Sequence, residues 1–288
     1  MLLLLAVSIL WGFSFGLVNA EFSSLDPATL AGARLLIALP CFVPFLKGSF
    51  LQWRPANGKL ILTGAIQYGL MYVSLFSAFR WLSGYEVALL TIFTPLYVVL
   101  AHAVLGRRLP PAWFWWTALL AVAGAAWIFQ PDSLPQKWPG ILLMQAANLC
   151  FATGQIAWRR IRAGLPGRDS DGYALLYLGG VLACLPFALP HAPVAGLMAL
   201  TGSQWLALVY LGTVASGLGF FLWNAGASRV NPATLAVFNN LKIPVAILIS
   251  VTVFKEEANP RSLIPGVFIL LLALGWAEAA NRRYRHHA

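Results

Sequence analysis

Charged residues are scarce in this sequence. Asp, Glu, Lys and Arg together make up 10% of the 288 residues, whereas 60% are hydrophobic. Soluble globular domains average about 25% charged residues, so the composition excludes an ordinary water-soluble fold. The apolar runs follow one another with only short loops between them, and no low-complexity linker marks a separate domain. The chain is therefore predicted to be an integral membrane protein.

Cysteine and catalytic motifs are also scarce. The three cysteines, Cys41, Cys150 and Cys184, all fall inside apolar segments, without a CxxC pair or paired histidines. This pattern argues against a disulfide framework and against a metal site, and we expect no cofactor. The sequence has no Walker A lysine motif, no HExxH or GxSxG motif and no pair of carboxylates deep in a segment. We therefore expect neither ATP hydrolysis nor an enzyme.

The formal net charge of +10 would favour a nucleic-acid partner in a soluble chain. Here the basic residues lie in short loops between apolar segments, so we interpret them as signals for membrane orientation and expect no nucleic acid. Ten segments are about 20 residues long, the length that crosses a bilayer. They lie at 1–20, 28–46, 58–80, 84–105, 112–130, 139–160, 172–190, 203–227, 232–254 and 261–281.

Orientation follows from the distribution of basic residues among the loops. With ten spans, one side of the membrane receives thirteen basic residues and the other side receives four. Positive loops stay in the cytoplasm, which predicts cytoplasmic N and C termini. The first segment resembles a signal peptide before Glu21, but it lacks a positively charged start and is expected to be a mature membrane helix.

The sequence contains an internal repeat. The run Leu82–Pro111 corresponds to Asn231–Pro260 at a constant offset of 149 residues, which places Pro95 on Pro244. Each copy is an apolar segment broken by a proline, so the repeat predicts a duplicated membrane helix. Two halves, 1–130 and 139–281, contain five helices each, and an odd number makes them inverted repeats within one membrane domain. Inverted repeats are typical of alternating-access transporters.

Several motifs resemble the drug/metabolite transporter superfamily, in particular its ten-helix EamA-type members. The resemblance covers essentially the whole chain and rests on LWGFSF at 10–15, Arg34, the run 78–95, LGRRLPP at 105–111, and the runs 231–244 and 254–260. Within the superfamily the chain looks most like the YddG-type exporters of aromatic amino acids. The resemblance implies two five-helix repeats and a central cavity between helices 1, 3, 4, 6, 8 and 9.

Polar residues deep in the membrane are the first candidates for that cavity, because they are costly when they face lipid. In the sixth segment, Gln145, Asn148 and Gln155 recur with Ala152 at helical spacing and form one stripe. The stripe is expected to face protein or water. Such amides also hydrogen-bond neighbouring helices, and this structural role stays open for each of them. His102 is a further candidate, although it lies near the end of its segment.

Lys242 is the sharpest candidate, because it lies well inside the ninth segment and no carboxylate lies at comparable depth. We expect Lys242 and Asn239 to hold the carboxylate of an amino acid. A structural lysine that caps carbonyls near Pro244 is the alternative. Arg34 is interpreted as an orienting or structural residue outside the pore. An aromatic wall is expected from the following residues: Tyr72, Tyr97, Trp158 and Trp223.

Pro95 and Pro244 are predicted hinges. Each proline removes a backbone donor and leaves carbonyls about one turn earlier without their usual partners. In a membrane these carbonyls need protein or cavity water, which favours inward-facing fourth and ninth helices. A static kink is the alternative interpretation.

Together these features predict a carrier in the bacterial inner membrane that exports amino acids, in particular aromatic or other large neutral ones, or related small metabolites, by alternating access and without ATP. The partners expected are a small-molecule substrate and the lipid bilayer, with no obligate protein partner. A nucleotide-sugar or phosphorylated-metabolite transporter, or a broad drug/metabolite exporter, is the alternative. A nucleotide-sugar carrier would be expected to line its cavity with more than one basic residue.

Overall fold

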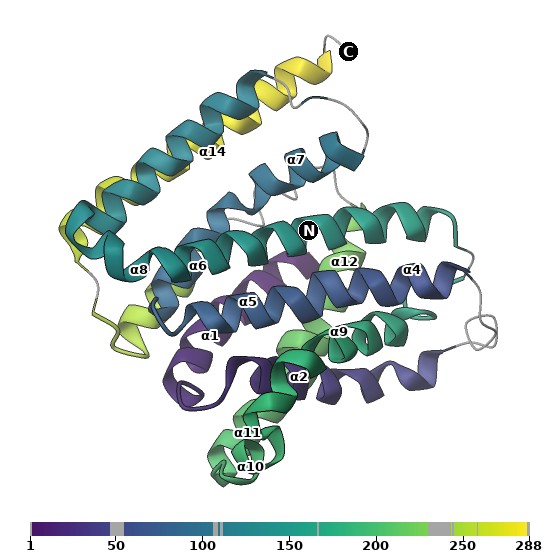
Figure 1. Ribbon diagram of the computed structural model, residues 1–288. Coiled ribbons are helices and arrows are strands. Elements are labelled where there is room, and N and C mark those ends of the chain that lie inside the picture. Colours follow the sequence, from purple (N-terminus) through teal and green to yellow (C-terminus); the bar gives the residue numbers. More distant parts are fainter. Residues whose placement is uncertain are drawn as a thin grey trace.

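Helices account for the regular structure of this protein (Figure 1). The computed structural model describes residues 2–46, 55–105, 109, 112–165, 167–229, 243, 245–257 and 259–286, and no strand occurs among them. Six helical stretches in these residues are long and apolar enough to cross a membrane: Leu2–Glu21, Pro55–Ala78, Gly84–Val104, Pro135–Ala163, Tyr173–His191 and Gly202–Arg229. Pro27–Cys41 and Trp115–Gly124 are shorter apolar helices. An all-α membrane fold is thereby confirmed for the described residues.

The first half begins with two helices joined by a tight loop. Asp26 caps the second helix by accepting a hydrogen bond from the backbone N–H of Thr29 at 2.9 Å, and Pro27 occupies the first turn, where its missing N–H costs nothing. The elements of this half are α1 (Leu2–Glu21), α2 (Pro27–Ala38), η1 (Leu39–Cys41), η2 (Val43–Phe45), α4 (Pro55–Gly64), η3 (Ala65–Leu70), α5 (Met71–Ala78), α6 (Gly84–Leu90), η4 (Thr91–Phe93) and α7 (Thr94–Leu105).

A single bent helix joins the two halves. The sequence predicts separate helices at 112–130 and 139–160, but α8 runs unbroken from Ala112 to Ala163, a length of 52 residues. Figure 1 shows α8 changing direction sharply between a limb that lies beside α14 (Pro260–His286) and a limb that lies along α5. The segment 131–139 contains three prolines. Prolines kink a helix without having to end it, so the structure has a bend where the sequence predicted a loop.

The second half follows α8 with shorter elements. They are α9 (Tyr173–Ala188), η5 (Leu189–His191), α10 (Pro193–Met198), α11 (Gly202–Tyr210), η6 (Leu211–Leu218), α12 (Gly219–Arg229) and α14.

Two rare π-helical segments occupy related positions in the two halves. They are η3 (Ala65–Leu70) and η6 (Leu211–Leu218). With the offset of 149 residues found in the sequence repeat, η3 falls on 214–219 and so overlaps η6. A π segment widens the turn and is frequent at functional sites. Both segments lie in the middle of long apolar helical stretches, Pro55–Ala78 and Gly202–Arg229.

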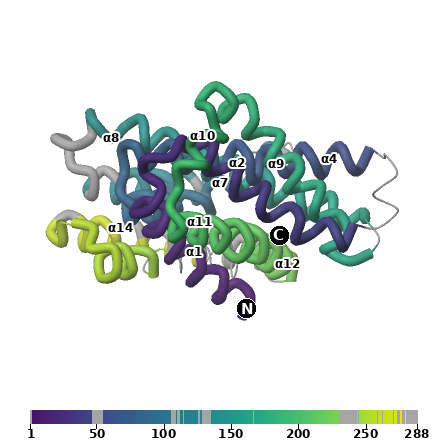
Figure 2. The backbone as a smooth tube through the Cα atoms, turned by 90° about the horizontal axis from the view of Figure 1, so that it is seen from below, coloured from purple at the N-terminus to yellow at the C-terminus, as the bar shows by residue number. Residues whose placement is uncertain are grey.

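Close helix packing holds α9 against α2 and α4. Figure 2 shows α2, α4 and α9 gathered on one side, and contacts between α9 and each of the other two confirm this arrangement. A Cβ atom placed on Gly64 would lie 1.8 Å from the backbone oxygen of Leu176, and one on Gly179 would lie 1.9 Å from that of Ile61. Only glycine permits this approach, so these glycines serve helix packing.

One end of the bundle collects polar contacts between distant loops. Asp26 lies 3.5 Å from Arg80 and 4.0 Å from His191, and Lys137 forms an ion pair with Glu86 at 2.5 Å. These five residues lie in or beside the loops that the sequence predicts on the side with few basic residues, which we call the odd-loop end.

The odd-loop end is also tied by Glu256. This carboxylate accepts hydrogen bonds from the backbone N–H groups of Gly84 at 3.1 Å and Tyr85 at 2.9 Å, and from the side chain of Asn19 at 2.9 Å. A residue of the second half therefore caps the N-terminus of α6 in the first half.

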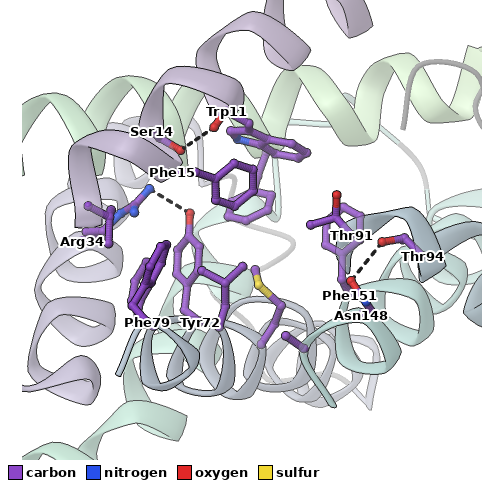
Figure 3. A pocket seen from close by; sticks show the side chains of 16 residues that line it. Trp11, Ser14, Phe15, Arg34, Tyr72, Phe79, Thr91, Thr94, Asn148 and Phe151 are labelled. Atoms are coloured by element: carbon purple, nitrogen blue, oxygen red, sulfur yellow. Dashed lines mark hydrogen bonds between the residues drawn. The ribbon is translucent and has the colours of Figure 1, made fainter. Parts of the chain in front are cut away.

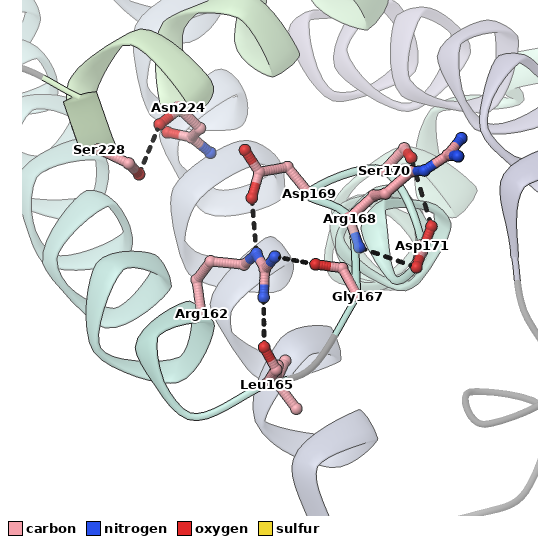
Figure 4. A network of polar contacts seen from close by, with 9 residues as sticks. All are labelled: Arg162, Leu165, Gly167, Arg168, Asp169, Ser170, Asp171, Asn224 and Ser228. Carbon is pink, nitrogen blue, oxygen red and sulfur yellow. Dashed lines mark hydrogen bonds and ion pairs between the residues drawn. The ribbon is translucent and has the colours of Figure 1, made fainter.

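The opposite end carries a clamp centred on Arg162 (Figure 4). Arg162 lies 25 residues beyond Lys137 on α8, which corresponds to about 37 Å along a helix. Its guanidinium pairs with Asp169 at 2.6 Å and donates to the backbone oxygens of Leu165 and Gly167. The turn after α8 is thereby fixed before α9 begins.

Candidate functional site

A cavity lies among the helices of both halves (Figure 3). Its empty volume is about 560 Å³, including the solvent at its mouth. Most of its lining is apolar or aromatic. The lining residues are Trp11, Ser14, Phe15 and Val18 of α1, Arg34 of α2, Met71, Tyr72, Leu75 and Phe76 of α5, Phe79, Thr91 of η4, Thr94 of α7, Ala147, Asn148 and Phe151 of α8, and Phe220 of α12.

Arg34 supplies the positive charge in this lining. Its exposed fraction is 2%. The guanidinium donates from Nε to the hydroxyl of Ser216 at 3.2 Å and from Nη2 to the hydroxyl of Tyr72 at 3.1 Å. Its central carbon lies 4.7 Å from the centre of the Tyr72 ring and 5.0 Å from that of Phe76. These contacts hold a cation in place without neutralising it.

No carboxylate pairs with Arg34 among the residues that the structure describes. The two hydrogen bonds use two of the five N–H donors of the guanidinium. A buried cation without a counter-charge is costly in a membrane protein, and a carboxylate that enters the cavity would satisfy both its charge and its free donors. The arrangement is suited to binding an organic anion.

A second polar group faces the cavity from the other side, as Figure 3 shows. Asn148 donates to the backbone oxygen of Leu90 at 2.9 Å and accepts from the hydroxyl of Thr94 at 3.1 Å. The oxygen of Leu90 is accessible because the helix tightens in η4, where the N–H of Thr94 bonds Thr91 and not Leu90. The turn before Pro95 therefore creates a polar spot at the cavity wall.

An aromatic cluster closes the cavity on the side of α12. The ring of Trp11 lies 5.9 Å from that of Phe151, 5.2 Å from that of Phe220 and 5.1 Å from that of Trp223. The indole N–H of Trp11 donates to the backbone oxygen of Ala215 in η6 at 2.9 Å. These four rings, Trp11, Phe151, Phe220 and Trp223, are called the aromatic gate below.

A wider and more polar space adjoins the cavity at the odd-loop end. Both spaces are lined by Val18, Phe76 and Phe79, and the wider one reaches Asp26, Arg80 and His191. We call the wider space the vestibule. The cavity is thus bordered by the vestibule toward the odd-loop end and by the aromatic gate on the side of α12.

The structure brings some of the sequence-predicted residues to this cavity and separates others. Tyr72 and Asn148 line it. Gln155, Trp158 and Trp223 are buried beyond its lining. Gln145 and Tyr97 are half-buried and His102 is exposed, and none of the three lines the cavity.

The remaining predictions concern the repeat prolines and the ninth segment. Pro95 lies in the first turn of α7, directly after η4. Lys242, Asn239 and Pro244 lie outside the described residues.

Arg34 lines the cavity, although the sequence interpretation placed it outside the pore as an orienting or structural residue. The available signal was a cation in the middle of an apolar segment, the same signal that singled out Lys242. The structure moves Arg34 from the periphery to the cavity wall.

Long apolar helices around a cavity with the buried cation Arg34 are typical of an integral membrane carrier for a small molecule. Both stretches 1–130 and 138–276 match the EamA-like transporter family. The chain belongs to this family, as its motifs predicted.

Relatives and solved structures extend this result. The chain is 34% identical over 279 residues to the biotin transporter of Escherichia coli (strain K12), covering 95% of this chain and 91% of the relative. It is 30% identical over 171 residues to the aromatic amino acid exporter YddG of Ancylobacter novellus, covering 57% of this chain and 56% of that protein. The biotin transporter is thus similar over much more of the chain than the exporter type that the motifs favoured.

A crystal structure with 20% sequence identity superposes with a TM-score of 0.68 and covers 98% of this chain and 96% of its own. This similarity supports the fold.

Proposed function

We propose that this protein carries a small organic monocarboxylate with an apolar body across the membrane, and that biotin is its leading candidate substrate. The observation that carries the proposal is Arg34, a buried cation on the cavity wall that lacks a carboxylate partner among the described residues. The carboxylate of the substrate would take the free donors of this guanidinium.

The chemistry of biotin fits the rest of the cavity. Biotin has one carboxylate on an aliphatic chain, and at its other end a compact ring system with a neutral ureido group. An aliphatic chain is compatible with the apolar wall between Arg34 and Asn148. The similarity to biotin transporters supports this choice of substrate.

Export of aromatic amino acids is the second candidate. The aromatic lining and the similarity to an aromatic amino acid exporter favour it. An amino acid also carries an ammonium group, which requires an anion or several carbonyl acceptors. The described lining of the cavity contains no carboxylate for this group, so a plain monocarboxylate is the better match.

Transport would proceed by alternating access between two inverted five-helix halves, 1–130 and 139–281, without ATP. Ten spans, cytoplasmic termini and a location in the bacterial inner membrane are parts of the same proposal. The π segments η3 and η6 and the broken helix at Pro95 are the flexible points that such a movement needs.

Counterflow in proteoliposomes tests the substrate. Purified protein is reconstituted with unlabelled biotin, phenylalanine, tryptophan or a nucleotide sugar inside, and entry of the labelled compound is followed. We expect biotin to be exchanged and the nucleotide sugar not to be. If aromatic amino acids are exchanged and biotin is not, the second candidate replaces the first. Exchange of the nucleotide sugar alone would overturn both candidates.

A further inference from the structure

Five polar atoms in and beyond the aromatic gate have no hydrogen-bond partner among the described residues. They are Nε2 and Oε1 of Gln155, Nε1 of Trp158, Nε1 of Trp223 and Oε1 of Gln67. The exposed fraction is 1% for Gln155, 2% for Trp158, and 0% for both Trp223 and Gln67. Buried polar groups in native proteins are nearly always paired, so each orphaned atom calls for an explanation.

These atoms belong to one region of the structure. Gln155 follows Phe151 by four residues on α8 and precedes Trp158 by three, so the three side chains share one helix face. The ring of Trp158 lies 5.3 Å from that of Tyr173, whose hydroxyl accepts from Asn224 at 3.0 Å. We call Gln67, Gln155, Trp158 and Trp223 the orphan cluster.

Helix packing brings the other two members to the same place. Gln67 donates to the side-chain oxygen of Asn224 at 3.2 Å. Gln67 also packs closely against α8, since a Cβ atom placed on Gly154 would lie 2.2 Å from the Cβ atom of Gln67. Trp223 adjoins Asn224 in the chain, and its ring lies 6.4 Å from that of Phe151. The cluster therefore lies where α8, η3 and α12 meet.

The polar groups next to the orphan cluster, in contrast to its own unpaired atoms, form several hydrogen bonds. Asn224 accepts from Gln67 and donates to the hydroxyls of Tyr68 and Tyr173, both at 3.0 Å. Tyr173 donates in turn to the backbone oxygen of Phe220 at 2.8 Å. The same helices can thus satisfy buried polar groups, yet within the described part of the chain two indole donors and the whole carboxamide of Gln155 have no partner.

The cluster lies beyond the cavity, toward the end of the molecule that carries Arg162. Phe151 lines the cavity and also forms part of the aromatic gate, and Gln155 follows it by one turn of α8. Gln155 is seven residues beyond Asn148, which corresponds to about 10 Å toward the end that carries Arg162. Trp223 belongs to both the aromatic gate and the orphan cluster, so the cluster directly adjoins the gate.

We infer that Gln67, Gln155, Trp158 and Trp223 form a second subsite on the path, which binds the neutral hydrogen-bonding group of the substrate. Two indole N–H groups match a carbonyl oxygen with two lone pairs, and the carboxamide oxygens match N–H donors. A cyclic urea or amide offers this combination, whereas a second carboxylate would leave the acceptors unused. This inference rests on the proposed function, because it assigns the ureido end of the same substrate.

Three variants in the full-length protein test the subsite. Gln155→Leu removes the whole amide, and Trp158→Phe and Trp223→Phe remove an indole donor while keeping a ring. We expect biotin counterflow to fall about tenfold in Gln155→Leu and several-fold in each tryptophan variant. Gln145→Leu is the control on the same helix. This variant also removes an amide whose oxygen is unpaired, but Gln145 lies ten residues before Gln155 on α8. The variant is therefore expected to keep biotin uptake within about twofold of the wild-type rate.

A second readout separates ligand binding from folding. Replacing an unpaired buried amide by leucine is expected to raise the melting temperature of the ligand-free protein by a few degrees. A residue needed only for structure would lower it. We also expect Gln155→Leu to bind biotin and an analogue methylated at both ureido nitrogens equally, whereas the wild type prefers biotin.

The outcomes distinguish this subsite from the proposed function. If the wild type exchanges biotin and Gln155→Leu exchanges it at an unchanged rate, the subsite is overturned while the proposed function stands. If the wild type neither binds nor exchanges biotin, the proposed function fails and the subsite fails with it. A lower melting temperature together with unchanged ureido preference would make the cluster structural and would also overturn the subsite.

Discussion

At the scale of single residues, Arg34 is held between two hydroxyls and two aromatic rings. Moving an ion out of water costs several kcal/mol, which hydrogen bonds and cation–π contacts of about 1 to 2 kcal/mol each offset without neutralising the charge. The uncompensated positive charge is available to an incoming anion. A charged substrate is therefore expected to stabilise the protein when it binds.

The hydroxyl of Tyr72 positions this guanidinium. It accepts from Arg34 at 3.1 Å and bonds Ser216 at 2.9 Å, so its loss frees the arginine to take other rotamers. Tyr72→Phe is expected to raise the KM for a carboxylate substrate about fivefold to tenfold, which corresponds to about 1 kcal/mol, the net contribution of a typical hydrogen bond. Transport kinetics in proteoliposomes measure this effect.

Tyr97→Phe is the matched control, because Tyr97 is half-buried on α7 and does not line the cavity. Its KM is expected to equal that of the wild type. Equal effects of the two substitutions would remove the positioning role of Tyr72.

Sequence patterns predicted part of this site. The helical spacing of Asn148 in an apolar segment indicated an inward face, and the structure places it at the cavity. The role of Arg34 was not predictable in this way, because its partners Tyr72 and Ser216 lie 38 and 182 residues away in the chain. Local periodicity contains no information about such contacts.

At the scale of elements, the break before Pro95 shapes the fourth predicted span. Gly84–Leu90 and Thr94–Leu105 are α-helical, and the turn between them is tightened. Asn148 donates to Leu90 in this turn, so the break is anchored to α8 at the cavity.

Pro95→Ala is expected to slow transport several-fold while leaving expression and KM near the wild-type values. The alanine restores a backbone donor and favours a straight helix, which resists a change of curvature. The maximal rate of counterflow checks this expectation. A rate equal to that of the wild type would show that the break is a static kink.

Glu256 joins the elements of the two halves by capping α6. Its carboxylate accepts two backbone N–H bonds and one bond from Asn19. Glu256→Ala is expected to cost about 1 to 2 kcal/mol of stability, because the N-terminal donors of the helix lose their partner. Thermal unfolding in detergent measures the loss as a lower midpoint.

Glu257→Ala provides the comparison at the neighbouring position, where the side chain is exposed. Its midpoint is expected to match that of the wild type. An unchanged midpoint for Glu256→Ala as well would mean that the cap contributes nothing measurable.

The sequence predicted the long apolar elements better than their internal shape. Segment lengths and loops follow from the apolar runs, and α1 and α9 begin and end within a few residues of the prediction. The bend in α8 and the π segments depend on packing between helices, so apolar periodicity does not reveal them.

At the scale of the whole molecule, the cavity is asymmetric between the two ends. The vestibule adjoins the cavity at the odd-loop end, and the orphan cluster adjoins the aromatic gate, with which it shares Trp223. This arrangement is what an alternating-access carrier shows when its cavity opens to one side. The family match shows that the chain is a transporter of the EamA-like type.

Single cysteines test which end is external. In a variant without the native cysteines, Gly202→Cys is expected to react with a membrane-impermeant maleimide in intact cells, and Gly164→Cys only after lysis. Both positions accept a Cβ atom, since its nearest neighbour would be 3.7 Å away at Gly164 and beyond 4 Å at Gly202. The reverse pattern would place the termini outside, against the distribution of basic residues.

The most direct test of the central claim compares biotin with its neutral amide. Binding of both compounds is measured by calorimetry to purified wild-type protein and to Arg34→Gln. We predict that the wild type prefers biotin by about tenfold to a hundredfold and that the variant loses this preference while still folding. A preference for the carboxylate that persists in Arg34→Gln would contradict the account, because the anion would then bind elsewhere.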